Sequence, residues 1–382
     1  MPEQSTLPAP LYPVVRRHLD EFSTDLGFWQ HASKANPDPT FGYCTDDVCR
    51  ALIVDVLQSS QLGWAAVDAS VRRHLRFMEA ASGASSRRFR NFRSADGTWL
   101  EAEGSEDSHG RAMQSLALTV AGSPDPAIRE AARRLYVRAL PAARSLLHPR
   151  PVAQALIACD VAVEAGVGAD SERTFELLAG RLAEVFRRPQ AAPDWPWPEP
   201  TLTYENALLP RALIIAGQRL GDGSMMRGGC RVLDWLISVQ TSPRGEFSPV
   251  GNAGWWPMGG QKSQFDQQPI EAMAMILAAE TALTATGDAR YRHAAEMAYG
   301  WYLGANDVGV AVAIPLAGAC NDGLTPTGVN SNQGAESTLA WLTALEHIRA
   351  LRAADAGVAS RGARSAGSMA DPTASAAAGS QS

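Results

Sequence analysis

The stretch FSPVGNAGWWPMGGQKSQFDQQPIE, residues 247–271, separates two helical segments and shows how the helices of this chain are joined. Glycines and prolines interrupt it every few residues, so it keeps the period of neither a helix nor a strand. It is therefore predicted to be a long ordered loop. Such loops are uncommon in compact domains, and one that carries Asn252, Trp255, Trp256 and Asp266 is more typical of a binding surface than of a linker.

Around this loop, apolar residues recur at three- and four-residue spacing along most of the chain, which is the pattern of amphipathic helices. Runs with the period of two that strands need are nearly absent. The pattern predicts an all-α protein with helices at residues 11–23, 46–60, 65–80, 108–121, 125–146, 151–166, 170–188, 203–220, 224–240, 267–286, 288–304 and 333–353.

Short and long links alternate between these helices. Tight turns such as 221–223 join the two helices of a pair, whereas long links such as 241–266 join one pair to the next. Antiparallel helices joined in this way place the long links at one end. The repeated pairs predict a closed (α/α)6 toroid, in which helix 11–23 closes the ring against 333–353. The inner helices are expected to begin near residues 46, 108, 151, 203, 267 and 333.

The bulk composition supports one large domain and excludes some partners. A chain of 382 residues with 46% hydrophobic content can bury a large core, and the toroid is predicted to span residues 10–354 as a single domain. Residues 1–9 are expected to be flexible, and the Ala/Ser/Gly-rich tail at 355–382 to be disordered. A net charge of −6 argues against a nucleic-acid partner, which needs a basic surface.

The N-terminal sequence and the cysteines indicate the cellular compartment of the protein. No apolar segment is present near the N-terminus, so neither a signal peptide nor a membrane span is expected, and a cytoplasmic location is predicted. The five cysteines are scattered without CxxC or Cys/His ligand spacing. They are predicted to be reduced, and neither a metal site nor a cofactor is expected.

Acidic and amide side chains gather where the inner helices are predicted to begin, in motifs such as TDDVCRA (45–51) and SEDSHGRA (105–112). N-capping and the helix dipole explain one acid at a helix start. They do not explain this density, which the outer helices lack. We therefore expect a shared funnel lined by Asp46, Asp47, Glu103, Glu106, Asp107, Glu205, Asn206, Asp266, Gln267, Gln268, Asn330, Gln333 and Glu336.

This inventory suits sugars, because hydroxyl-rich ligands are held by carboxylates, amides and arginines and by flat aromatic rings. An oligosaccharide or glycoconjugate is therefore the expected ligand. For Trp195 and Trp197 the alternative is burial in the core. The further substrate-binding residues predicted for the funnel are Tyr43, Arg90, His109, Arg111, Trp195, Trp197, Tyr204, Asn252, Trp255 and Trp256.

Cleavage of a glycosidic bond needs one protonated and one ionised carboxyl group. Glu106 or Asp107 is favoured as the acid, because neighbouring like charges raise the proton affinity of at least one of them. Asp266 is favoured as the base, with Glu336 in reserve. For each of the four, hydrogen bonding without proton transfer is the alternative. His109 has no second histidine at helical spacing and makes no metal site by itself.

Five groups of motifs within about residues 40–350 resemble one family. These motifs are similar to those of bacterial six-hairpin toroid proteins that are encoded beside, or fused to, GT-B glycosyltransferases and often carry a mannosyltransferase label. The resemblance implies the toroid fold, a glycosyltransferase partner and a mannoside-related substrate. The motifs are FGYCTDDVCRALI, RFRNF with GSEDSHGRA, WPWPEPTLTYENALLPRALI, FSPVGNAGWW with FDQQPIEA, and NDGLTPTGVNSNQGAEST.

The sequence favours a glycoside hydrolase, inverting more than retaining, that uses a carboxylate pair in the funnel. Transfer from a nucleotide sugar is not predicted, because the doubly wound Gly-rich architecture of such transferases is absent from the sequence pattern. A non-catalytic glycan-binding accessory of a glycosyltransferase and a phosphorylase or epimerase of the same fold stay open as alternatives. Epimerases of this fold use a pair of histidines, and only His109 is expected in the funnel.

Overall fold

The structure is a computed structural model and describes residues 9–83, 87–187 and 194–368. Its regular structure in these ranges is dominated by α-helices. They are α1 (Arg17–Phe22), α2 (Thr45–Leu62), α3 (Trp64–Ala81), α4 (Glu106–Gly122), α5 (Pro126–Ala143), α6 (Pro149–Glu164), α7 (Gly168–Arg187), α8 (Leu208–Leu220), α9 (Gly223–Val239), α10 (Pro269–Thr286), α11 (Ala289–Tyr302) and α12 (Ala335–Ser368).

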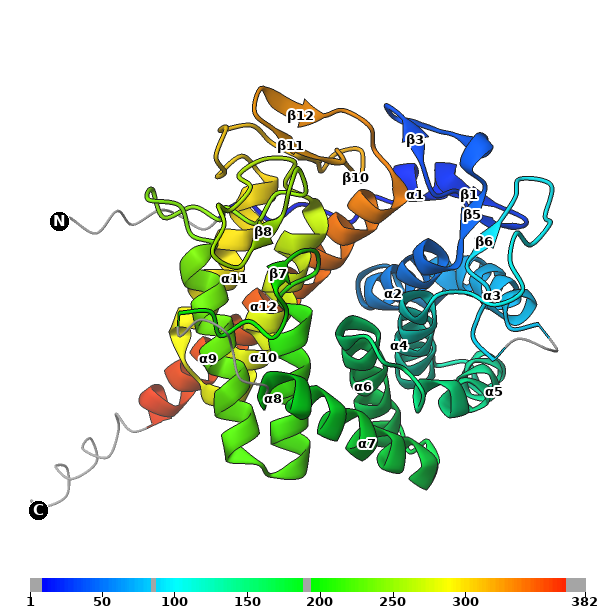
Figure 1. The fold of residues 1–382 in the computed structure, drawn as a ribbon, viewed down its shortest axis with the longest axis horizontal. Helices are drawn as coiled ribbons and strands as arrows, with labels where there is room; N and C mark the ends of the chain where they lie inside the picture. The colour runs from blue at the N-terminus through cyan, green and yellow to red at the C-terminus, as the bar shows by residue number, and fades with distance from the viewer. Residues whose placement is uncertain (1–8, 84–86, 188–193, 369–382) are drawn as a thin grey trace, which may run out of the picture.

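The even-numbered helices α2 to α12 form a closed inner ring. Each packs against the next one, and α12 packs against α2. Helices α3, α5, α7, α9 and α11 lie outside this ring, each against the inner helix that precedes it (Figure 1). The fold is an (α/α)6 toroid, which confirms the predicted fold class.

Close approach of the paired helices depends on small residues. At Gly217 of α8 a Cβ atom would lie 2.4 Å from the backbone nitrogen of Met226, so α8 and α9 pack with almost no space between their backbones. Helix α10 contacts α8, α11 and α12, and most of its side chains are buried and apolar. Such a helix belongs to the interior of the toroid.

The first predicted helix is much shorter than expected. Pro13 lies near the start of the predicted helix 11–23, and a proline disfavours the helical conformation of the residue before it. Residues 9–16 are non-helical, and their carbonyls accept hydrogen bonds from Tyr299 (3.0 Å, to Pro10) and Arg352 (2.8 Å, to Ala9). Only α1 is helical, and it contacts α12 as the ring closure predicted.

The predicted helix 203–220 also begins late, at Leu208. Glu205 has a positive φ of 47°, which a right-handed helix does not allow. Its neighbour Asn206 instead accepts a hydrogen bond from the Thr203 amide at 3.1 Å. This non-helical turn delivers Glu205 to the axis of the toroid, where it contacts Arg111.

Short antiparallel ladders tie the long links together. Two of them join different links, β5 to β6 and β7 to β8, and Gln267 pairs with Leu324 in an isolated bridge. Several strands lie along one edge of the molecule in Figure 1. The pairs are β1 (Ser23–Thr24) with β2 (Gly27–Phe28), β3 (Ala32–Ser33) with β4 (Asn36–Pro37), β5 (Tyr43–Cys44) with β6 (Phe92–Arg93), β7 (Thr201–Leu202) with β8 (Trp256–Pro257), β9 (Ala313–Ile314) with β10 (Ala319–Cys320), and β11 (Gly323–Thr325) with β12 (Gly328–Asn330).

Other expectations for the chain as a whole fare differently. All five cysteines are free and buried, as predicted. Within the described ranges, no helix combines the length and the apolar character that a membrane crossing requires. Residues 355–368, expected to be disordered, continue α12 as helix. Residues 1–8 and 369–382 lie outside the described residues, and the proposed domain limits stay a prediction.

Candidate functional site

A polar cavity of about 550 Å³ opens where the long links meet the first turns of α2 and α12. We call it the mouth cavity. Five carboxylate side chains and one arginine line it, and His31 has the only aromatic ring on its wall among the described residues. The lining residues are Gln30, His31, Cys44, Asp46, Asp47, Arg50, Asn252, Asp266, Gln268, Asp322, Gly323, Thr325, Asn330, Gly334, Glu336 and Ser337.

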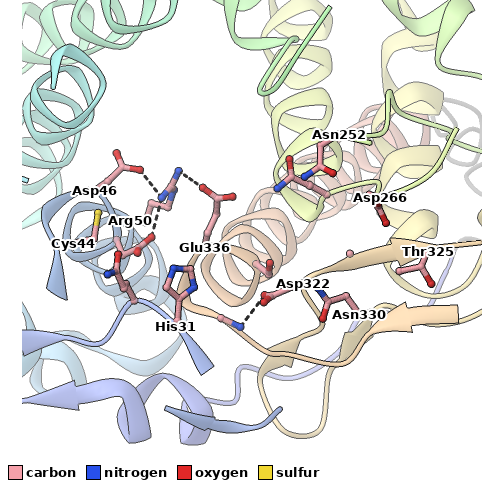
Figure 2. Close-up of a pocket in the computed structure, with 16 residues that line it drawn as sticks. His31, Cys44, Asp46, Arg50, Asn252, Asp266, Asp322, Thr325, Asn330 and Glu336 are labelled. Atoms are coloured by element: carbon pink, nitrogen blue, oxygen red, sulfur yellow. Dashed lines mark hydrogen bonds and ion pairs between the residues drawn. The ribbon is translucent and has the colours of Figure 1, made fainter. Parts of the chain in front are cut away.

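One side of the cavity, here called the near wall, is built by the starts of α2 and α12. Asp46 and Arg50 are four residues apart on α2 and share a helix face. The Arg50 guanidinium lies 2.6 Å from Asp46, 2.9 Å from Asp47 and 2.8 Å from Glu336 of α12. Figure 2 shows Arg50 between Asp46 and Glu336. One arginine thus holds three carboxylates together.

The two consecutive acids of the near wall differ in proton affinity. Burial, with the charges of Asp46 and Glu336 nearby, raises the pKa of Asp47 to about 7 although Arg50 donates a hydrogen bond to it. Burial also acts against ionisation of Asp46, but Arg111 and Arg50 outweigh it and lower its pKa. The site therefore holds an ionised Asp46 beside an Asp47 whose raised pKa lets it keep its proton to a higher pH.

Below the near wall, ion pairs cross the axis of the toroid. Arg111 of α4 donates to Asp46 at 2.6 Å and to Glu205 at 2.8 Å. The side chains of Arg111 and Glu205 are each 5% exposed, so this pair is almost fully removed from water. Together with Arg50 and Glu336 these residues form a continuous charged layer, which we call the floor.

A second cavity, the lower cavity, lies under the floor and has a volume of about 110 Å³. Arg50, Arg111 and Glu205 line its upper side. All six inner helices contribute to it, mostly with aliphatic side chains such as Leu57, Leu118, Ile157, Val161 and Leu277. The floor therefore separates a polar space from an apolar one.

The opposite side of the mouth cavity, here called the far wall, is a ribbon made by two long links. The Gln267 amide donates to the Leu324 carbonyl at 3.1 Å, and the Leu324 amide donates back at 2.9 Å. Side chains alternate along such a ribbon. Asp266, Gln268 and Thr325 therefore line the cavity, whereas Gln267 and Leu324 are fully buried on the other side.

Backbone geometry fixes this ribbon in place. A Cβ atom on Gly251 would lie 1.7 Å from the carbonyl oxygen of Phe265, so only glycine allows the two segments to come so close. Asp266 itself has a φ of 59°, in the left-handed region that few residues other than glycine adopt. The main chain thus presents the Asp266 side chain at one position of the far wall.

Seven of the predicted site residues line the mouth cavity together, and they come from distant parts of the sequence. Three more lie at or below the near wall. Arg111 and Glu205 belong to the floor, and Asp107 accepts a hydrogen bond from the Tyr204 hydroxyl at 3.2 Å. Burial and the Asp46 charge raise the pKa of Asp107. The seven lining residues are Asp46, Asp47, Asn252, Asp266, Gln268, Asn330 and Glu336.

Glu106, predicted as an alternative acid, does not reach the mouth cavity. Its carboxylate accepts hydrogen bonds from the amides of Leu147 at 2.9 Å and His148 at 3.0 Å, ahead of α6. Burial acts against its ionisation, but these donors outweigh burial and lower its pKa, which is unsuitable for an acid. Consecutive residues on a helix point about 100° apart, so Glu106 and Asp107 cannot share a direction.

His109 points away from the axis, contrary to the prediction. Its Nε2 lies 3.1 Å from the Ala139 carbonyl of α5, and burial lowers its pKa to about 4. Asp107 and Arg111 share the inner face of α4 at a spacing of four, and His109 lies halfway between them on the outer face. Within the described residues, no group of three or more His, Cys, Asp or Glu side chains is placed to hold a metal ion.

The predicted aromatic platforms are structural. Trp195 and Trp197 are 5% and 0% exposed, so the alternative of core tryptophans is the observed one. The Trp195 ring packs edge-on against Trp256 at 5.1 Å between centroids. Tyr43 is 2% exposed and stacks on Trp29. None of the predicted aromatic residues, Trp255 included, is among the lining residues of the mouth cavity.

The other predicted binding residues mostly bond within the scaffold. The Arg90 guanidinium lies 4.5 Å from the centre of the Trp99 ring. Glu103 pairs with Arg88 at 2.9 Å, and Asn206 donates to Glu271 at 2.9 Å. The Gln333 amide donates to the Lys34 carbonyl at 2.9 Å. These four residues do not line the mouth cavity.

Sequence reasoning missed several lining residues, and Arg50 is the most important. Its spacing of three and four from Asp47 and Asp46 on one helix could have revealed it. Asp322 lies in the motif NDGLTPTGVNSNQGAEST, but it is not among the predicted site residues. Gln30 and His31 carry no signal in the sequence, because only the folded chain brings the segment before α2 to the mouth.

No protein-family model matches the chain, and no curated protein sequence matches it either. Solved structures do match. A cellobiose 2-epimerase from Spirochaeta thermophila is 14% identical with a TM-score of 0.63, over 85% of this chain and 90% of that one. A D-mannose isomerase is 11% identical with a TM-score of 0.66, over 88% and 96%.

An α-1,6-mannanase from Salegentibacter sp. also matches, at 10% identity and a TM-score of 0.57 over 87% of this chain and 95% of that one. That structure is an inactive variant, with two consecutive aspartates replaced, in complex with α-1,6-mannotetrose. At these identities the likeness shows the fold. The chain has the six-hairpin, glycosidase-like fold on which these sugar-converting enzymes are built.

Proposed function

We propose that this protein is an inverting glycoside hydrolase that binds a hydroxyl-rich saccharide in the mouth cavity, with Asp47 as the general acid and Asp266 as the general base. The observation that carries the proposal is that two walls from distant parts of the sequence present carboxyl groups to one cavity. Glycosidases need such a pair, one protonated and one ionised. The carbohydrate-active structural neighbours agree with this class.

Asp47 meets the requirements for the acid better than its neighbours do. A general acid must hold its proton near the working pH and reach the leaving oxygen. Asp47 lines the cavity, and its pKa is raised to about 7. Asp46 is unsuitable because Arg50 and Arg111 each bind one of its two oxygens. Asp46 serves instead as a fixed anion that positions the two arginines.

Asp266 is suited to activate water from the opposite side. No ion pair to its side chain occurs within the described residues, so its charge is not shared with a cation. Glu336 is only the second candidate for the base, because it lies on the same side of the cavity as Asp47 and its charge is shared with Arg50. Inversion requires a water molecule between the base and the sugar, and the placement of Asp47 and Asp266 on different walls of the cavity supports this geometry over the separation of about 5–5.5 Å that retention needs.

The test is hydrolysis of manno- and gluco-oligosaccharides by Asp47→Asn and Asp266→Asn proteins. We expect each variant to lose at least about 10²-fold in kcat, because each lacks one of the two proton-transfer groups. Glu106→Gln is the matched control and should keep its activity, since Glu106 lies outside the cavity. Proton NMR of the first product identifies its anomer, and a retained configuration would contradict the assignment of Asp266 as a base.

An epimerase is the second candidate, and the cellobiose 2-epimerase and D-mannose isomerase neighbours favour it. Against it, His31 is the one histidine on the cavity wall among the described residues. Incubation with reducing disaccharides, followed by NMR at C2, separates the two activities. Saccharide binding by the wild type without hydrolysis or epimerisation would favour the third candidate, a glycan-binding accessory of a glycosyltransferase.

A further inference from the structure

The two walls of the mouth cavity differ in how their charges are balanced. On the near wall, Arg50 lies within 2.9 Å of each of three carboxylates, Asp46, Asp47 and Glu336. Arg111 supplies a second cation to Asp46 from below. Every carboxylate of the near wall therefore has an arginine partner, and among the described lining residues no arginine is left for an acidic ligand.

The far wall, to which we add Asp322 at its junction with the start of α12, has two carboxylates and no cation among the described residues. In the part of the chain that the structure describes, neither Asp266 nor Asp322 has an ion-pair partner. One oxygen of Asp322 accepts a hydrogen bond from the Gly334 amide at 2.8 Å, which fixes the side chain at the start of α12 (Figure 2). Among the described residues no donor reaches its other oxygen, which is available to a ligand in the cavity.

The rest of the lining restricts the ligand further. Asn252, Gln268, Thr325 and Asn330 offer hydrogen bonds, and among the described lining residues His31 carries the only aromatic ring. The described carboxylates are not gathered as a metal site. A ligand that fits must therefore be polar on all sides, short enough for about 550 Å³, and free of negative charge.

We infer that the mouth cavity selects a short saccharide that carries a protonated amino group, and that Asp322 is the carboxylate that binds this group. The inference rests on the proposed function only in treating the cavity as a sugar site. An ammonium group supplies the cation that the far wall lacks, and it donates to the free Asp322 oxygen. An acidic sugar would meet Asp266 and Asp322 without an available cation, and like charges brought together disfavour binding.

The test compares binding of three matched monosaccharides, glucosamine, glucose and glucuronate, with mannosamine, mannose and mannuronate as a second set. Ligand-observed NMR titrations at pH 6 and low salt give the affinities without any turnover. We expect the amino sugar of one set to bind about tenfold more tightly than the neutral sugar, since charge-assisted hydrogen bonds are the stronger ones. The acidic sugar should bind most weakly, and added salt should reduce the difference.

The Asp322→Asn variant tests the contribution of the Asp322 carboxylate by itself. This variant should bind amino and neutral sugars alike and leave the affinity for the neutral sugar within about twofold. Glu172→Gln, an equal charge change on the exposed face of α7, is the control and should keep the preference. A preference that survives in Asp322→Asn, or an acidic sugar that binds as tightly as the amino sugar, would overturn the inference. Absence of hydrolysis would count only against the proposed function.

Discussion

The mouth cavity and the lower cavity share the helices α2 and α12 and have opposite character. Carboxylates and amides from the helix starts and the long links line the first, in a volume of about 550 Å³. Aliphatic side chains from the following turns line most of the second, which has about 110 Å³. The floor between them consists of ion pairs at 2.6–2.9 Å. The position of a side chain along the axis therefore decides whether it faces a polar or a largely apolar space.

The largest effect is expected from breaking the floor. Arg111→Ala leaves Asp46 and Glu205 without their shared partner, and an uncompensated buried charge costs about 3–5 kcal/mol. Urea unfolding at pH 7 measures this loss. Arg133→Ala is the control, because the pair of Arg133 with Glu130 is about half exposed and should change stability by at most about 1 kcal/mol. Similar losses in the two variants would show that the floor is not a buried ion network.

A smaller effect is expected at Glu271, a buried acid of α10 on the mouth side. Burial raises its pKa from 4.5 to about 7. The folded protein binds the Glu271 proton more tightly than the unfolded chain does, and this tighter binding stabilises the fold. The stabilisation is complete below about pH 4.5 and is lost as the pH rises through about 7. The glutamine of Glu271→Gln is neutral at every pH. At pH 8 the free energy of unfolding of this variant should therefore exceed that of the wild type by roughly 2–4 kcal/mol.

The measurement for Glu271 is a series of urea unfolding curves between pH 4.5 and 8. The difference in the free energy of unfolding between Glu271→Gln and the wild type should grow between pH 4.5 and about 7 and stay level above that. Asp47 titrates in both proteins and cancels in the difference. Parallel stability curves for the two proteins would mean that Glu271 is ionised in the fold.

The smallest effect is expected in the lower cavity. Val161→Ile adds one methylene to an apolar space that has room for it, which should raise the free energy of unfolding by at most about 0.8 kcal/mol. Thr325→Val, an apolar change on the far wall, should bring no such gain because the mouth cavity is open and polar. Thermal unfolding compares the two, and equal gains would contradict the different character of the cavities.

The helices and the toroid followed from the sequence because they depend on local pattern. Most helix limits agree with the apolar periodicity to within a few residues. Two exceptions have local causes, Pro13 in the first helix and the positive φ of Glu205, and a third is α12, which continues beyond the predicted end at residue 353 to Ser368. The 3.6-residue period could also have corrected two site predictions. It separates Glu106 and His109 from the inner face that Asp107 and Arg111 share.

The sequence by itself determined that helical hairpins close into a ring and that acids stand at the starts of the inner helices, because helix formation and capping act over a few residues. Only the tertiary structure decided which acids meet. Arg50 binds Glu336 across 286 positions, and Arg111 binds Glu205 across 94. Burial in the fold, together with the charges of Arg50, Asp46 and Glu336, sets the pKa of Asp47. Charge interactions depend on distance in space, which separation along the chain does not give.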